Sequence, residues 1–260
     1  MKKQKHHDKK ILIFISGLLL IVLVLSFRYY YKMQAALKRS FYGLPKIAIV
    51  LDDWGYNLNN LELLRSIDIP LTLAVLPNLK YSAKMAEEAK FKNRQIILHM
   101  PMEPGRFVRL EKNTITTDMT QEKINAVLSS DLGSMSTLKG VSNHMGSKFT
   151  ADKKSMAIFL KQIKKKNLYF LDNVSCSNSV CVAVAKNLGV KIAERDVFLD
   201  NSNSKDYIRG QFAQVVGIAK KRGYAVATGH DRRRTLEVIK EIAPSLKNKV
   251  KFVFVSELAR

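Results

Sequence analysis

Apolar residues in this chain form short runs that alternate with longer segments of helical periodicity. Short apolar runs without polar alternation are typical of strands buried on both faces, whereas apolar positions three to four residues apart predict helices. Strands are predicted over residues 46–51, 71–75, 95–98, 140–142, 168–171, 190–193, 224–228 and 251–255. Helices are predicted over residues 57–66, 82–91, 120–132, 151–165, 180–188, 205–222 and 235–242. Repeated strand–helix units predict an α/β fold with a parallel sheet, either a barrel or a doubly wound sheet.

The N-terminal region has a different pattern. Residues 11–27 are almost continuously apolar and lie between two basic flanks. That length is at the lower limit for a helix that spans a bilayer, and Tyr29–Tyr31 resemble an interfacial aromatic belt rather than a cleavage site. We therefore expect a basic cytoplasmic tail (1–10), an uncleaved transmembrane signal-anchor (11–27), a linker (28–44) and a domain (45–260). The protein would cross the inner (cytoplasmic) membrane once, with the domain on the periplasmic or extracellular side.

Polar residues follow several of the predicted strands. All three histidines of the domain, His99, His144 and His230, lie at strand ends, and Asp52-Asp53 follows the first strand. The carboxyl ends of parallel strands meet at one edge, where active sites of such folds lie. One Asp and two His form a set of three ligands for a divalent metal with one open position. A second Asp could then take a proton from bound water, and a third His could protonate a leaving group.

Each of these residues also has a structural interpretation. An Asp-Asp pair before Gly55 is common in turns that cap a helix. The histidines could be hydrogen-bonded residues of the core or of loops. Trp54 could be a platform for a sugar ring or a core residue. The residues alone leave these alternatives open.

Charge and cysteine content limit the remaining possibilities. The net charge is +22, of which the nine basic residues and one Asp of the first 39 residues contribute +8, leaving +14 on the rest. A domain this basic attracts anionic polymers, although solvated Lys-rich faces explain the charge equally well. No helix-turn-helix, zinc finger or aromatic RNA-binding motif is found, so no specific nucleic acid is expected as a partner. Cys176 and Cys181 exclude a four-cysteine zinc site and could form a disulfide or remain as buried thiols.

Several strings along the chain resemble the motifs of the divergent polysaccharide deacetylases, the YibQ-like proteins, which are related to the NodB-type deacetylases. The matching strings are residues 47–56 (IAIVLDDWGY), 70–77 (PLTLAVLP), 98–104 (LHMPMEP), 140–147 (GVSNHMGS), 170–172 (FLD), 195–201 (RDVFLDN) and 229–230 (GH). They occur in the family's order and extend over about residues 45–258.

This resemblance implies a NodB-like distorted (β/α) barrel of about seven to eight mainly parallel strands. It also implies a metal-dependent hydrolase that removes acetyl groups from a cell-envelope polysaccharide. By the same resemblance Asp52 would be the catalytic base and His230 the acid, and Asp53, His99 and His144 would bind the metal, expected to be zinc. Substrate contacts are expected from six further residues, Trp54, Glu103, Asn143, Asp172, Arg195 and Asp196.

The chain departs from ordinary polysaccharide deacetylases at the motif that supplies the histidine ligands, and it has no clear counterpart of their Arg-x-Pro motif. Those enzymes take both histidine ligands from a His-x-x-x-His motif, whereas Glu103 stands at that spacing from His99. This difference motivates an alternative function, a non-catalytic envelope protein that uses the same rim to bind a glycan or a protein partner.

Overall fold

The computed structural model describes residues 15–34 and 43–260 and divides the chain into two units, Met1–Leu44 and Pro45–Arg260. In the first unit, the helix Ile15–Gln34 is long and apolar enough to cross a membrane, a property that signal sequences share. This helix overlaps the predicted anchor and continues through the three tyrosines. The predicted basic tail (1–10) and residues 35–42 of the predicted linker lie outside the described residues.

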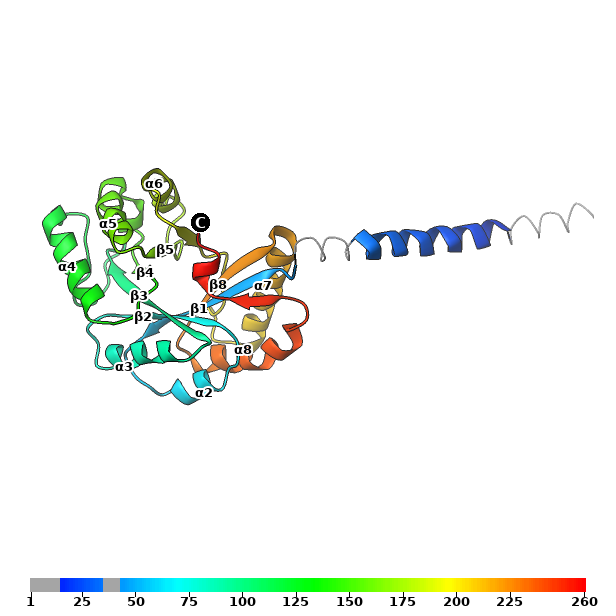
Figure 1. Ribbon diagram of the computed structural model, residues 1–260, viewed down its shortest axis with the longest axis horizontal. Coiled ribbons are helices and arrows are strands. Elements are labelled where there is room, and N and C mark those ends of the chain that lie inside the picture. Colours follow the sequence, from blue (N-terminus) through cyan, green and yellow to red (C-terminus); the bar gives the residue numbers. More distant parts are fainter. Residues whose placement is uncertain (1–14, 35–42) are drawn as a thin grey trace, which may run out of the picture. The chain divides into compact units, whose positions relative to one another are not determined.

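The second unit is built on one sheet in which every pair of strands is parallel (Figure 1). Eight strands follow the order β6-β5-β4-β3-β2-β1-β8-β7, and the ninth, β9, pairs with the first residues of β1. The strands are β1 (Lys46–Trp54), β2 (Leu71–Val75), β3 (Arg94–Met102), β4 (Gly140–Met145), β5 (Tyr169–Asp172), β6 (Ile192–Glu194), β7 (Val197–Phe198), β8 (Tyr224–His230) and β9 (Lys251–Val253). This arrangement confirms the predicted barrel, which is open between β6 and β7.

Helices cover the outer face of the sheet (Figure 1). They are α2 (Leu61–Arg65), α3 (Ser82–Ala86), α4 (Gln121–Gly133), α5 (Lys153–Lys165), α6 (Cys181–Leu188), α7 (Lys205–Arg222) and α8 (Arg233–Leu246). Short 3-10 turns occupy Glu87–Lys90, Phe149–Ala151 and Val255–Glu257. The predicted start of α4 is confirmed, because the Thr120 side chain accepts a hydrogen bond from the backbone N–H of Lys123.

The buried apolar residues form two clusters that lie on opposite faces of the sheet. Along β1, Ile47, Ile49 and Leu51 belong to the large cluster, which also contains the helix residues. Ala48 and Val50 belong to a smaller cluster made of strand residues and the C-terminal turn. Successive side chains of a strand point to opposite faces, so the smaller cluster fills the interior of the barrel. This alternation decides which polar side chains can reach the mouth of the barrel.

Candidate metal centre

Five polar side chains occupy interior positions at the carboxyl ends of the strands. Every second residue of a strand points into the barrel. Continued to the carboxyl end of each strand, this alternation places five residues inside: Asp52 in β1, His99 in β3, His144 in β4, Asn173 just after β5 and His230 in β8. The five come from segments far apart in the chain, and the parallel register aligns their ends. The site therefore lies at the mouth of the barrel, where the inward-pointing positions change from apolar to polar residues.

An irregularity in β1 adds a second carboxylate to this group. The register of β1 against β2 shifts between Leu51 and Trp54, and Asp53 has φ of 65°, which is uncommon for any residue but glycine. A bulge of this kind redirects the side chains that follow it. It brings Asp53 to the mouth beside Asp52, while Trp54 packs in the outer core cluster with no exposed surface.

Asp53, His99 and His144 form a compact group of possible metal ligands, with one ligand atom from each residue lying within 4.8 Å of the others. Asp53 Oδ1 is 3.0 Å from His144 Nδ1 and 3.3 Å from His99 Nε2. On the far side of its ring, His99 Nδ1 lies 2.8 Å from Ser142 Oγ, which fixes the orientation of the imidazole. Burial alone would raise the pKa of Asp53, but the hydrogen bonds with the two histidines hold it well below its usual range.

These three residues fit a divalent metal. One carboxylate and two imidazoles are a common ligand set of catalytic zinc, which leaves a coordination position open. Two buried polar atoms at the site, Asp52 Oδ1 and His144 Nε2, have no hydrogen-bond partner within residues 15–34 and 43–260. Buried polar atoms are rarely left without a partner, so these two are consistent with a site that binds an ion and water.

Asp52 is almost fully buried beside the group. Its Oδ2 accepts a hydrogen bond of 3.0 Å from the Asn173 side chain. Burial raises the pKa of Asp52, and the electrostatic interaction with His99 opposes that rise. A buried carboxylate with one such oxygen next to three candidate metal ligands is suited to accept a proton.

His230 pairs with Asp52 across β1 and β8, and its Nε2 is 3.7 Å from Asp53 Oδ2. Its Nδ1 is 2.9 Å from Oδ1 of Asp200, a fully buried carboxylate that also accepts hydrogen bonds from the His230 backbone N–H and from Thr235. Burial lowers the pKa of His230, but the hydrogen bond and charge of Asp200 outweigh this effect and raise it. The pair leaves Nε2 directed toward the site as a possible proton donor.

Asn173 and Asp200 were not among the predicted site residues. Asn173 also contacts Asn143, which accepts a 2.8 Å hydrogen bond from the Asn173 backbone N–H. Arg195 donates to the backbone carbonyls of Asn173 and Val174, at 2.7 and 3.1 Å. Asn143 and Arg195 therefore hold the segment that presents the Asn173 amide to Asp52.

This arrangement gives a prediction for Asn173→Ala. Turnover of any substrate should fall roughly 10- to 100-fold while bound metal is kept, because Asp52 loses the donor that orients it. Comparison of kcat, KM and metal content tests this, since a positioning role lowers kcat and leaves KM near the wild-type value. Asn178→Ala, an exposed amide of the same loop, is the control and should change none of the three. Equal effects of both variants would contradict the role of Asn173.

Three predicted substrate contacts are not brought to the mouth. Trp54 is fully buried and offers no ring face to a sugar. Asp172 has the outward position of β5, where it accepts hydrogen bonds from Ser179 and the backbone N–H of Val174. Asp196 pairs with Arg222 and the backbone N–H of Val226, beside the middle of β8 rather than its carboxyl end.

Glu103 lies near the mouth but is engaged with other groups. Its carboxylate bonds to Lys148 at 2.7 Å and to the backbone and hydroxyl of Thr117 at 2.8 Å. It is not part of the group of metal ligands formed by the described residues. The thiols of Cys176 and Cys181 are free in this structure, and Cys181 is buried.

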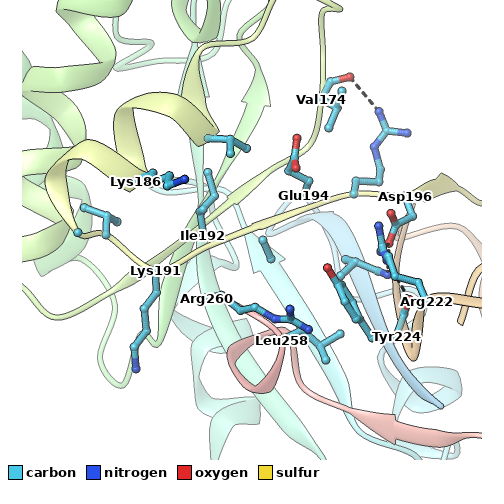
Figure 2. Close-up of a pocket in the computed structure, with 16 residues that line it drawn as sticks. Val174, Lys186, Lys191, Ile192, Glu194, Asp196, Arg222, Tyr224, Leu258 and Arg260 are labelled. Carbon is cyan, nitrogen blue, oxygen red and sulfur yellow. Dashed lines mark hydrogen bonds and ion pairs between the residues drawn. The ribbon is translucent and has the colours of Figure 1, made fainter.

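A separate pocket of about 740 Å³ lies at the opening of the barrel between β6 and β7 (Figure 2). Its lining includes Lys186, Lys191, Glu194, Asp196, Arg222, Tyr224 and Arg260. The Tyr224 ring lies between the guanidinium groups of Arg222 and Arg260, at 4.1 and 4.6 Å. None of the three candidate ligands is among the described residues that line it, so this pocket is distinct from the metal centre.

The backbone is strained at three points around the mouth. Asp53, Met145 and Val174, at or just after the ends of β1, β4 and β5, have positive φ of 65°, 55° and 48°. A β-branched residue such as Val174 is especially unfavourable there. Non-glycine residues in this conformation cluster at functional sites, where the surrounding structure holds them in place.

Comparison with known proteins agrees with this geometry. Residues 49–259 match the divergent polysaccharide deacetylase family. The uncharacterized protein YibQ of Escherichia coli K12 is 33% identical over 213 residues, covering 82% of this chain and 67% of YibQ.

Solved structures show the same fold. An uncharacterized protein of Agrobacterium tumefaciens C58 superimposes with a TM-score of 0.79 at 20% identity, over 83% of this chain and 89% of that one. The catalytic domain of a peptidoglycan N-acetylglucosamine deacetylase from Eubacterium rectale superimposes with a TM-score of 0.51 at 15% identity, over 82% and 89% of the two chains. From the match over residues 49–259 and the identity to YibQ, the chain belongs to the divergent polysaccharide deacetylase family.

Proposed function

We propose that the protein is a metal-dependent deacetylase of a cell-envelope glycan, held at the cytoplasmic membrane by the helix Ile15–Gln34 with its domain on the periplasmic or extracellular side. The observation that carries this proposal is the grouping of three candidate metal ligands with Asp52 and the His230–Asp200 pair at one end of the barrel. Family membership supports the reaction class, and the apolar helix supports the anchoring.

Each residue of the site has a role in hydrolysis of the acetamide. A divalent ion held by Asp53, His99 and His144 would lower the pKa of a water molecule and polarise the acetamide carbonyl. Asp52 would accept a proton from the water whose oxygen attacks the carbonyl carbon. His230, protonated and oriented by Asp200, donates a proton to the nitrogen as the C–N bond breaks. The reaction consumes one water molecule, and its products are acetate and the free amine of the sugar.

The test is metal-dependent release of acetate. The full chain, purified in detergent without a His tag, is depleted with a chelator, reloaded with zinc and incubated with N-acetylglucosamine hexamer. We expect about one ion per chain in the loaded protein, acetate release only after loading, and loss of release on chelation. A protein that binds the metal and the hexamer but releases no acetate would instead be the non-catalytic glycan-binding protein.

A further inference from the structure

The loop between β3 and α4 extends beside the metal centre, and we call residues 104–113 the rim loop. Hydrogen bonds attach it at three points, one of which joins the Asn113 side chain to Asp131 of α4 at 3.3 Å. Near its start, the backbone N–H of Gly105 donates to Ser147 Oγ at 2.8 Å. Near its end, Glu111 accepts a hydrogen bond from the Tyr56 hydroxyl. Ser147 and Tyr56 each follow a candidate ligand, His144 or Asp53, by three residues, so the rim loop bridges the two segments that carry these ligands.

Between Gly105 and Glu111 the loop exposes apolar side chains to solvent. Phe107 is completely exposed and Leu110 is 43% exposed, and Tyr56, which is bonded to Glu111 of the same loop, is 47% exposed. Met145, next to His144, is 36% exposed. Exposed apolar groups gathered at one place on a soluble domain mark binding surfaces more often than single scattered ones do. Aromatic rings are suited to contact with the C–H face of a sugar, because they offer a large rigid apolar surface.

Positive charge accompanies these apolar groups. Arg106, Arg109 and Lys112 are exposed in the rim loop, whereas its one acid, Glu111, is bonded to Tyr56. Among the described residues, no carboxylate forms an ion pair with Arg106, Arg109 or Lys112. Unpaired guanidinium groups next to an exposed ring match a ligand that carries both sugar rings and carboxylate or phosphate groups.

We propose that the rim loop, together with Tyr56, binds the glycan strand next to the sugar held at the metal centre and selects an anionic strand. This inference rests on the proposed function, because it takes the same strand to reach the candidate ligands. The position of the loop supports it, since Gly105 and Glu111 are bonded to Ser147 and Tyr56, each three residues after a candidate ligand. The charge supports an acidic glycan over a neutral one, and the exposed Phe107 supports stacking on a ring.

Binding of two glycan probes that differ in charge tests the proposal. Hyaluronan hexamer carries N-acetylglucosamine and carboxylates, whereas N-acetylglucosamine hexamer is neutral. Titration of the zinc-loaded full chain in detergent should show tighter binding of the anionic hexamer, by about fivefold or more at low salt, with the difference falling as salt is added. The double variant Arg106→Ala/Arg109→Ala should remove this preference and leave binding of the neutral hexamer unchanged. Phe107→Ala should weaken binding of both probes, by roughly fivefold.

Two control variants separate the loop from general effects. Lys220→Ala/Lys221→Ala removes two exposed charges at the end of α7, and Phe91→Ala removes a partly exposed ring before β3. Neither should change binding of either probe. The proposal is overturned if the charge preference survives in Arg106→Ala/Arg109→Ala or is lost equally in the α7 variant. A second result would also overturn the proposal. If the protein binds neither glycan but binds anionic phospholipid vesicles, and Phe107→Ala weakens that binding, the loop is a membrane contact.

The same variants distinguish this proposal from the proposed function. Glycan binding that depends on the rim loop, in a protein that releases no acetate under any metal loading, would support the loop and contradict the deacetylase. Acetate release with no effect of the loop variants on binding or on KM would support the deacetylase and contradict the loop.

Discussion

Asp53→Ala and His99→Ala are each expected to reduce bound zinc from about one ion per chain to less than a tenth of that in the presence of equimolar metal. Each variant removes one of three ligands from the group, and the remaining two cannot enclose the ion. Loss of a residue that only supports a ligand already weakens metal affinity 10- to 100-fold, so loss of a ligand itself should weaken it more than about 100-fold. Elemental analysis of the full chain after dialysis measures the effect directly.

The matched control for these variants is His230→Gln. It also removes an imidazole from the mouth, but Nε2 of His230 lies 3.7 Å from Asp53 and outside the ligand group. It should keep about one ion per chain. Zinc should also raise the melting temperature of wild type and His230→Gln but not of the two ligand variants, because binding to the native state alone stabilises it. Full metal content in Asp53→Ala or His99→Ala would show that the ion is held elsewhere.

Much of the fold follows from periodicity. The helix predicted at residues 205–222 has those bounds as α7, and β2 and most of β5 also lie where the apolar runs predicted them. β3 continues four residues beyond its predicted end, through Pro101 to Met102. β2 ends opposite Leu98, so the missing N–H of Pro101 removes no bond to β2. Pro101 instead pairs with β4, and its carbonyl accepts a hydrogen bond from the Ile115 backbone N–H. β7 is too short to have a periodicity of its own and was not predicted.

The site follows from the same periodicity only in part. Alternation along β5 places Asp172 outward and Asn173 inward, so counting in twos from Leu171 would have selected Asn173 rather than Asp172. Asp200 lies just after β7, a strand that was not predicted, so the sequence did not indicate that Asp200 lies at a strand end. Trp54 could not be placed by alternation, because the bulge at Asp53 reverses the direction of the side chains that follow. Local backbone irregularities of this kind depend on tertiary contacts rather than on sequence pattern.

Asp52→Asn is expected to lower kcat for acetate release by roughly 100- to 10,000-fold, the range for loss of a general acid or base. The amide has the same shape as the carboxylate and can still contact the Asn173 side chain, so the fold and the three metal ligands are unaffected. It cannot accept the proton that the attacking water loses. KM and bound zinc should therefore stay near their wild-type values, a pattern that separates loss of chemistry from loss of binding.

Asp131→Asn is the control for this change. Asp131 is also a buried carboxyl that accepts hydrogen bonds from asparagine side chains, Asn78 at 2.7 Å and Asn113 at 3.3 Å, and burial raises its pKa as it does for Asp52. Removing its charge should leave kcat within about twofold of wild type, because no reacting atom is near it. If Asp52→Asn instead loses its zinc, Asp52 is a ligand and some other group must accept the proton. If it keeps both zinc and turnover, the free Oδ1 of Asp52 has no part in the reaction.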